Sequence, residues 1–207
     1  MTRSGDTVTP EQAAIIAAAA AAAAARAAPR PSLEAIWHAL DAVPDPEIPV
    51  VSVVELGIVR GAEWDHADPA TLIVRVTPTY SGCPATELIM KGIADALTAL
   101  GVTDVRLETK LAPAWTTDWI APAAKRKLRE YGIAPPPDGA TRAGAAAPST
   151  RVDVSGISPL RRTAVVVPCP RCGSAQTTLV SQFGSTACKA HYRCDDCLEP
   201  FDYFKPH

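Results

Sequence analysis

The hydrophobic residues from Ser32 onward change their spacing from helical to alternating and back, which predicts a succession of helices and strands. The first helical repeat follows Ser32, a favourable N-cap residue, and consists of Leu33, Ile36, Trp37 and Leu40. Prolines then impose an extended backbone on residues 44–49, whose sequence is Pro-Asp-Pro-Glu-Ile-Pro. Two strands are expected at 58–64 and 72–77, joined by a turn-rich connection at 65–70.

A second amphipathic helix and a further strand follow. The helix is expected to end at Gly101, after an apolar face formed by Ile89, Ile93, Leu97 and Leu100. Apolar and charged residues alternate over 105–111, which predicts a half-buried strand, and a basic helix is expected at 122–131. Together these elements predict an α+β fold for residues 32–134, a small mixed α/β domain of about a hundred residues.

Segments without such periodicity separate the other parts of the chain. Residues 1–31 are a low-complexity extension whose run Ala13–Ala28 is interrupted only by Ile15, Ile16 and Arg26. The run is too short and too weakly apolar to span a membrane, and its acidic flank does not fit a signal peptide, so we expect a cytoplasmic protein. Residues 135–164 are rich in proline, glycine and alanine and are expected to form a flexible linker before a C-terminal unit at 165–207.

Charge and composition narrow the class of function. The chain of 207 residues has a net charge of −2 and 5% aromatic residues, which argues against a protein that mainly coats nucleic acid or stacks bases. Residues 33–133 carry nine Lys/Arg against fourteen Asp/Glu, a net charge of −5, whereas residues 161–207 carry six against four, a net charge of +2. This uneven distribution favours protein partners over nucleic acid.

Two C-x-x-C pairs give the strongest chemical signal. Cys169 with Cys172 and Cys194 with Cys197 are separated by 21 residues, and together they offer four thiolates for one tetrahedral ion. This spacing predicts a four-cysteine zinc ribbon, with an iron–sulfur centre on the same thiolates as the minor alternative. The glycine after Cys172 is expected to let the backbone turn sharply beneath the metal.

Two further potential ligands lie between those pairs. Cys188 and His191 are alternative metal ligands, either in place of a paired cysteine or at a second site. Four thiolates already satisfy one ion, so a packing role for Cys188 and a surface position for His191 are favoured. The aromatic tail Phe201-Asp202-Tyr203-Phe204 is expected to pack over the metal site and form the core of the ribbon.

The remaining cysteine, Cys83, stands in a glycine-containing turn between an expected strand and an expected helix. A thiolate at a helix N-terminus has a lowered pKa, which would suit metal ligation or nucleophilic attack. A small buried packing residue is an equally weighted alternative. Asp45 and Glu47, which stand between prolines, are weaker candidates for metal ligands.

Catalysis by Cys83 is disfavoured. A cysteine hydrolase needs a histidine base that a third group holds in place, and residues 32–134 offer only His38 and His66. Both are expected to be solvated or packing residues. A Gly-rich phosphate loop and a G-x-S-x-G elbow are also absent from the sequence, so nothing requires the chain to be an enzyme.

Several of these segments resemble a known family. Asp45-Pro46-Glu47-Ile48-Pro49, Leu56-Gly57-Ile58-Val59 and Thr77-Pro78-Thr79-Tyr80-Ser81-Gly82-Cys83-Pro84 resemble the SufT-like, or MIP-type, iron–sulfur assembly domain, whose motif cysteine corresponds to Cys83. With residues 113–120, the ribbon and residues 183–190, the chain resembles the D-subunit family (PaaD/PaaJ) of the ring-1,2-phenylacetyl-CoA epoxidase system. The resemblance covers about residues 33–133 and 165–207; the N-terminal extension and the long linker depart from it.

The resemblance implies an accessory, non-catalytic component of aerobic phenylacetate degradation. Its partners would be the epoxidase subunits, above all the iron–sulfur reductase or the di-iron component, with a homodimer as a further option. Cys83 would carry a transient iron–sulfur cluster or iron, with Asp45 and Glu47 beside it, and the ribbon would hold zinc and dock a partner. The linker would either hold the ribbon close to Cys83 or leave it free.

Two other classes of function stay open at this point. The chain would be a stoichiometric structural subunit of the oxygenase if it co-purified stably with the catalytic subunits. A nucleic-acid-binding ribbon is the weaker alternative, because its support is confined to the basic set Arg161, Arg162, Arg171, Lys189 and Arg193. Basic residues near a zinc site are more often a solvated face, so neither nucleic acid nor a membrane is expected as a partner.

Overall fold

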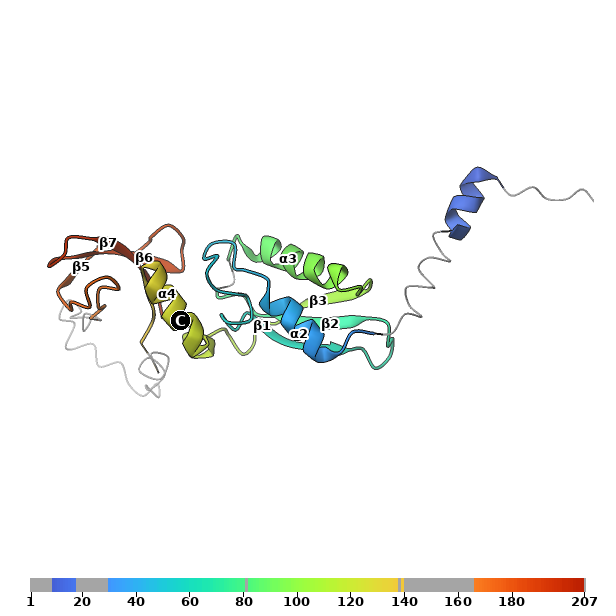
Figure 1. Cartoon of the computed structure of the whole chain (residues 1–207), viewed down its shortest axis with the longest axis horizontal. Coiled ribbons are helices and arrows are strands. Elements are labelled where there is room, and N and C mark those ends of the chain that lie inside the picture. The colour runs from blue at the N-terminus through green and yellow to red at the C-terminus, as the bar shows by residue number, and fades with distance from the viewer. Residues whose placement is uncertain (1–8, 18–29, 81, 138, 140–165, 207) are drawn as a thin grey trace, which may run out of the picture.

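The computed structural model describes residues 9–17, 30–80, 82–137, 139 and 166–206, which form two β-sheets with helices packed beside them (Figure 1). The first sheet has the strand order β1-β2-β3, with β1 antiparallel to β2 and β2 parallel to β3. Its strands are β1 (Val59–Trp64), β2 (Leu72–Val76) and β3 (Val105–Thr109). This confirms the expected α+β class for the first folded part of the chain.

Two helices cover one face of this sheet. Helix α2 (Leu33–Asp41) contacts β1, helix α3 (Thr86–Ala99) contacts β3, and the two helices contact each other. The Ser32 hydroxyl accepts a hydrogen bond of 3.1 Å from the Ala35 N–H, as its N-cap position predicts. Of the apolar faces expected from the sequence, Ile36, Leu40, Ile93 and Leu97 each expose 0% of their surface, whereas Leu33 is 45% exposed.

The second sheet has the strand order β4-β7-β6-β5. Its strands are β4 (Ile133–Ala134), β5 (Thr177–Ser181), β6 (Lys189–Cys194) and β7 (Pro200–Phe204). Three of them form the expected ribbon, β6 antiparallel to both β5 and β7. The fourth, β4, comes from the first part of the chain: it follows helix α4 (Pro122–Tyr131) and runs parallel to β7.

The two parts of the chain also share a hydrophobic core. Phe204 and Cys188 of the ribbon are buried in the same cluster as the apolar faces of α2 and α3. The Phe204 ring lies 6.0 Å from the ring of Trp115, whose indole N–H donates to the Leu56 carbonyl. Since side chains alternate along β7, Phe201 and Tyr203 face the metal-binding side while Phe204 faces away from it. The expectation that the whole aromatic tail covers the metal is therefore wrong for Phe204.

Much of the expected extension and linker lies outside the described residues. Residues 10–17 are helical and exposed, and the remainder of the alanine run is not described. The same holds for residues 140–165 of the linker, so the domain boundaries stay a prediction. Within the described ranges, no helix is long and apolar enough to cross a membrane.

Gly57 lies against Trp119, in the segment that follows the first sheet, and a substitution at Gly57 tests this close contact. Its φ of +68° is left-handed, and an added Cβ would lie 2.7 Å from Trp119 Cβ and 2.9 Å from the Trp119 carbonyl oxygen. We expect Gly57→Ala to lower the free energy of unfolding by about 2 kcal/mol or more, because backbone strain and a backbone clash add. Urea-induced unfolding of the zinc-loaded protein measures this change.

Gly101→Ala is the matched control. Gly101 has a φ of +92° but no heavy atom within 4 Å of an added Cβ, so only the backbone cost of about 1 kcal/mol applies. Equal destabilisation by the two substitutions would show that the contact with Trp119 does not constrain position 57.

Candidate metal centres

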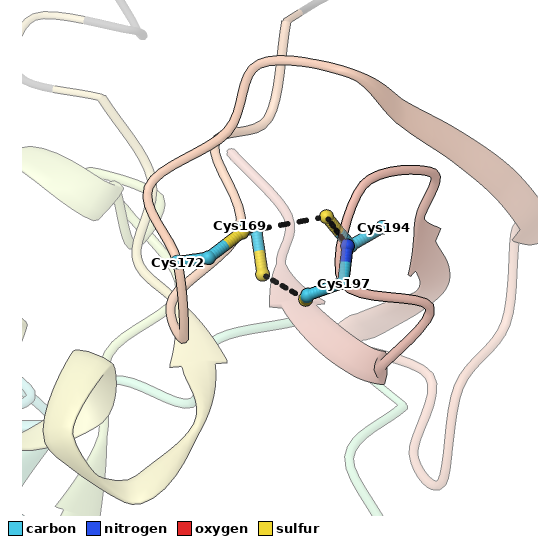
Figure 2. A group of neighbouring side chains, drawn as sticks. All are labelled: Cys169, Cys172, Cys194 and Cys197. Carbon is cyan, nitrogen blue, oxygen red and sulfur yellow. Dashed lines mark hydrogen bonds between the residues drawn. The ribbon is translucent and has the colours of Figure 1, made fainter.

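The four cysteines of the C-x-x-C pairs converge on one point (Figure 2). Cys169 and Cys172 come from the loop before β5, Cys194 ends β6, and Cys197 lies in the turn before β7. The Cys169 and Cys197 sulfurs are 3.7 Å apart, those of Cys172 and Cys194 are 3.6 Å apart, and all four lie within 4.8 Å of one another. A tetrahedral zinc ion with bonds of about 2.3 Å places its sulfurs about 3.8 Å apart, so the thiolates fit zinc.

Matching backbone turns hold the two cysteine pairs. The Cys169 N–H donates to the Ser174 carbonyl at 2.9 Å, and the Cys194 N–H donates to the Glu199 carbonyl at 3.0 Å. The residue after each second cysteine is left-handed, Gly173 with φ +78° and Leu198 with φ +64°. Gly173 predicted the first turn from the sequence. The second turn was not predicted, because there an exposed leucine, Leu198, takes the left-handed conformation.

The electrostatics of this site favour thiolate formation at Cys194. The Cys197 N–H donates to the Cys194 sulfur at 3.5 Å, and this backbone contact is the main cause that lowers the pKa of Cys194 to about 7. Tyr192, Phe201 and Tyr203 pack beside the site, with Tyr192 stacked on Phe201. His191 lies on the same sheet, but its Nδ1 is 3.3 Å from the Asp202 carboxylate and outside the four-cysteine group.

A second group of chemically active side chains meets where the two parts of the chain pack together. Asp45, Glu47, Cys83 and Cys188 all line one cavity of about 20 Å³, which the Phe204 ring also borders. The Cys188 thiol donates to Glu47 Oε2 across 3.8 Å. A cavity of this size holds about one water molecule or a single ion.

Asp45 and Glu47, the two carboxylates of the proline-rich segment, have different hydrogen-bond partners. Asp45 Oδ1 accepts the N–H groups of Glu47 and Ile48, both at 2.9 Å, so this side chain shapes the turn itself. Burial is the main cause that raises the pKa of Asp45. Glu47 is half-buried, and its carboxylate reaches the Cys188 thiol.

Cys83 does not have the lowered pKa expected from its position in the sequence. Helix α3 begins at Thr86 with Ala85 as its N-cap, so Cys83 lies before the helix rather than at its first turn. Burial raises the pKa of the half-buried Cys83 thiol, and the negative charge of Glu47 adds to that effect. The backbone N–H of Ala85 opposes it only in part. Cys83 is therefore a neutral thiol at neutral pH in the metal-free chain, and a bound cation would have to displace its proton.

Cys188 is buried in the core that the ribbon shares with the first domain, in agreement with the packing role favoured from the sequence. It is 5% exposed and lies directly before β6, on the Cys83 side of the ribbon and away from the four paired cysteines. Burial raises the pKa of this thiol as well. The only signal in the sequence was a sixth cysteine outside any C-x-x-C pair, and its hydrogen-bond partner Glu47 lies 141 positions earlier, beyond the reach of spacing arguments.

Comparisons with known proteins find relatives for both parts of the chain. Residues 33–107 match an iron–sulfur cluster assembly protein family, and residues 156–205 match the PaaD zinc beta ribbon domain. A curated protein of Escherichia coli (strain K12), named as the D-subunit of 1,2-phenylacetyl-CoA epoxidase, is 47% identical over 180 residues. The match covers 84% of this chain and 93% of that protein.

Solved structures of limited similarity cover about half of the chain. A DUF59 domain of unknown function from Bacillus anthracis is 26% identical with a TM-score of 0.41, over 45% of this chain and 87% of that chain. A conserved hypothetical protein from Thermotoga maritima is 27% identical with a TM-score of 0.41, over 49% and 97%. A Mycobacterium tuberculosis protein described as associated with [Fe-S] complex assembly and repair is 30% identical with a TM-score of 0.30, over 48% and 85%.

The four-cysteine geometry predicts that zinc and ribbon folding are a single equilibrium. We expect the purified chain to hold about one zinc ion in this site, and Cys194→Ser to lose it and to unfold β5–β7, because a structural zinc ion contributes folding free energy directly. Elemental analysis combined with limited proteolysis measures both effects.

Cys188→Ser serves as the control for this experiment, since Cys188 lies outside the four-cysteine group. It should retain the zinc ion and the protease resistance of the ribbon. Zinc lost from Cys188→Ser, or a zinc-free Cys194→Ser that resists the protease, would contradict the assignment of ligands.

Proposed function

This chain belongs to the D-subunit family of 1,2-phenylacetyl-CoA epoxidase, and from this premise we propose that it is a maturation factor for that enzyme system. It would deliver iron, as an ion or a cluster, to a metal-dependent partner, the iron–sulfur reductase or the di-iron component. Cys83 is the residue proposed to hold this cargo. Cys169, Cys172, Cys194 and Cys197 are proposed to hold a structural zinc ion.

The observation that carries this proposal is the cavity beside Cys83. It places a cysteine thiol next to two carboxylates, Asp45 and Glu47, within a domain that matches an iron–sulfur cluster assembly family. Thiolate and carboxylate oxygen are both ligands of iron in proteins. The name of the Escherichia coli relative supplies the enzyme system in which such cargo would be used.

The same cavity supports an accessory role rather than catalysis. Its volume of about 20 Å³ is far below the roughly 300 Å³ or more of a pocket that binds an ordinary small molecule. No histidine occurs among the described residues that line it, so the Cys83 thiol has no general base of the usual kind beside it. This cavity is therefore not itself a site for turnover of a coenzyme A thioester.

A stoichiometric structural subunit is the second candidate function. The observation in its favour is that the relative is named a subunit, with its match spanning 93% of that protein. A structural subunit would remain bound to the assembled enzyme, whereas a maturation factor would leave after delivery.

The test is the iron and acid-labile sulfide content of the partner subunits, expressed with this chain, without it, or with Cys83→Ser. We expect at least one partner to be metal-poor without the chain and to be restored by the wild-type chain but not by Cys83→Ser. Zinc content and protease resistance of the variant control for folding.

Two results would separate the candidates. Partners that are fully loaded in the absence of the chain would rule out maturation. Stable one-to-one co-purification with these loaded partners would then favour the structural subunit.

A further inference from the structure

We propose that Cys188 is the second thiolate ligand of the cargo site, so that the ribbon completes a site begun by the assembly domain. Cys83 and Cys188 would each supply one sulfur to a single Fe²⁺ ion, and Glu47 would supply a carboxylate oxygen. This inference rests on the proposed function for the identity of the cargo. It assigns the ribbon a direct part in holding the metal, beyond docking a partner.

These three side chains come from two units and line one cavity, although among the described residues only the four paired cysteines have all their ligand atoms within 4.8 Å of one another; binding an ion would therefore draw the Cys83 sulfur toward Cys188 and Glu47. Glu47 comes from the proline-rich segment, Cys83 from the turn before α3, and Cys188 from the start of β6. The Cys188 thiol reaches Glu47 Oε2 at 3.8 Å. Tyr80 and Cys83 both pack against the hydrophobic cluster that contains Cys188.

The chemistry of the donor set suits a divalent transition metal. Two thiolates favour iron or zinc over magnesium and calcium, and a carboxylate is a common third ligand of iron. Binding exchanges two S–H bonds for two Fe–S bonds, releases two protons to solvent and changes no oxidation state. The cavity of about 20 Å³ has room for one ion, whereas a [2Fe–2S] cluster would require the ribbon to move away from Cys83.

The net charge of the proposed Fe²⁺ site and the charge of Lys189 have opposite signs. Fe²⁺ with two thiolates and one carboxylate carries a net charge of −1. Lys189, which follows Cys188 and is only 4% exposed, acts electrostatically on both Cys188 and Asp45. Its Nζ lies 3.7 Å from Asp202 Oδ2, and Lys189 does not line the cavity.

Hydrogen bonds to the loop before β6 hold Cys188 in place. The Cys188 carbonyl accepts the Lys205 N–H at 3.0 Å, and the Thr186 hydroxyl lies 3.0 Å from the Cys188 sulfur. The Ser185 hydroxyl donates to the Asp202 carboxylate at 2.9 Å. A Cβ at Gly184 would lie 2.8 Å from Asp202 Oδ1, so the loop packs tightly on β7.

Strand β6 connects this site to the zinc site. Cys188 immediately precedes the strand and the zinc ligand Cys194 ends it. At about 3.3 Å per residue the two sulfur positions are separated by roughly 20 Å along the strand, too far for one metal to influence the other directly. Zinc would therefore support the cargo site only by keeping β6 folded and in place.

The test is anaerobic titration of the zinc-loaded full chain with Fe²⁺, with Co²⁺ as a spectroscopic probe of thiolate ligation. We expect the wild-type chain to bind one ion in addition to zinc. Cys83→Ser and Cys188→Ser should each weaken that second binding by about 100-fold or more while keeping zinc. His191→Ala is the matched control, since it alters the same strand outside the cavity, and it should bind Fe²⁺ as the wild type does.

The spectrum of the wild-type chain with Co²⁺ in the second site tests the inference without any substitution, so it does not depend on how the variants fold. Charge-transfer absorption equivalent to two thiolates in the wild-type second site supports the inference. Absorption equivalent to one thiolate, or wild-type Fe²⁺ affinity in Cys188→Ser, would overturn it. No second ion bound by the wild type would overturn it as well.

The two proposals fail in different ways. If partner loading needs Cys83 while Cys188→Ser binds Fe²⁺ normally, the further inference falls and the maturation role stands. If both thiols are needed for Fe²⁺ binding but the partners load fully without the chain, the two-thiolate site stands and the maturation role falls.

Discussion

Coordination of one ion by four thiolates is the constraint on which the C-terminal ribbon depends. The ribbon strands β5–β7 surround a small core, in which Phe201 and Tyr203 are the large side chains, so apolar burial alone gives this unit little stability. The four cysteine sulfurs, within 4.8 Å of one another, close its two turns. The closed ribbon packs Phe204 and Cys188 into the hydrophobic core of the first domain.

The alternation of side chains along β7 links the hydrophobic core of the ribbon to the core of the first domain. Along β7, alternate side chains point to the metal side and to the first domain, so the same five residues stabilise the ribbon and attach it. Parallel pairing of β4 with β7 adds backbone hydrogen bonds to this attachment. The cavity between Cys83 and Cys188 therefore has walls from both units, and neither unit alone would define its shape.

Local patterns in the sequence predicted most of the helices and strands, but not the contact between the first domain and the ribbon. Helix α4 has the expected bounds and α2 the expected cap, because helical spacing, Ser32 and Gly132 act within a few residues. The zinc ligands were also readable, since C-x-x-C spacing is a local geometric requirement. Cys188 was assigned to packing because four paired thiolates already satisfy one ion, and its contact with Glu47 could not be predicted because the two residues are distant in sequence. Of the two equally weighted expectations for Cys83, the lowered pKa is wrong, because the helix begins only at Thr86 and burial outweighs the backbone N–H of Ala85.

A site divided between two units suits cargo that has to leave. If the proposed ligands lay within one fold, release would require local unfolding of that fold. If Cys188 is a ligand as proposed, release would require the ribbon to shift while its zinc site keeps it folded. Such a shift would re-expose Phe204, at about 2 kcal/mol for a buried aromatic side chain, and would also break the pairing of β4 with β7. Docking of a partner protein supplies free energy on that scale from a few buried contacts, so partner binding and release of the metal can be a single event.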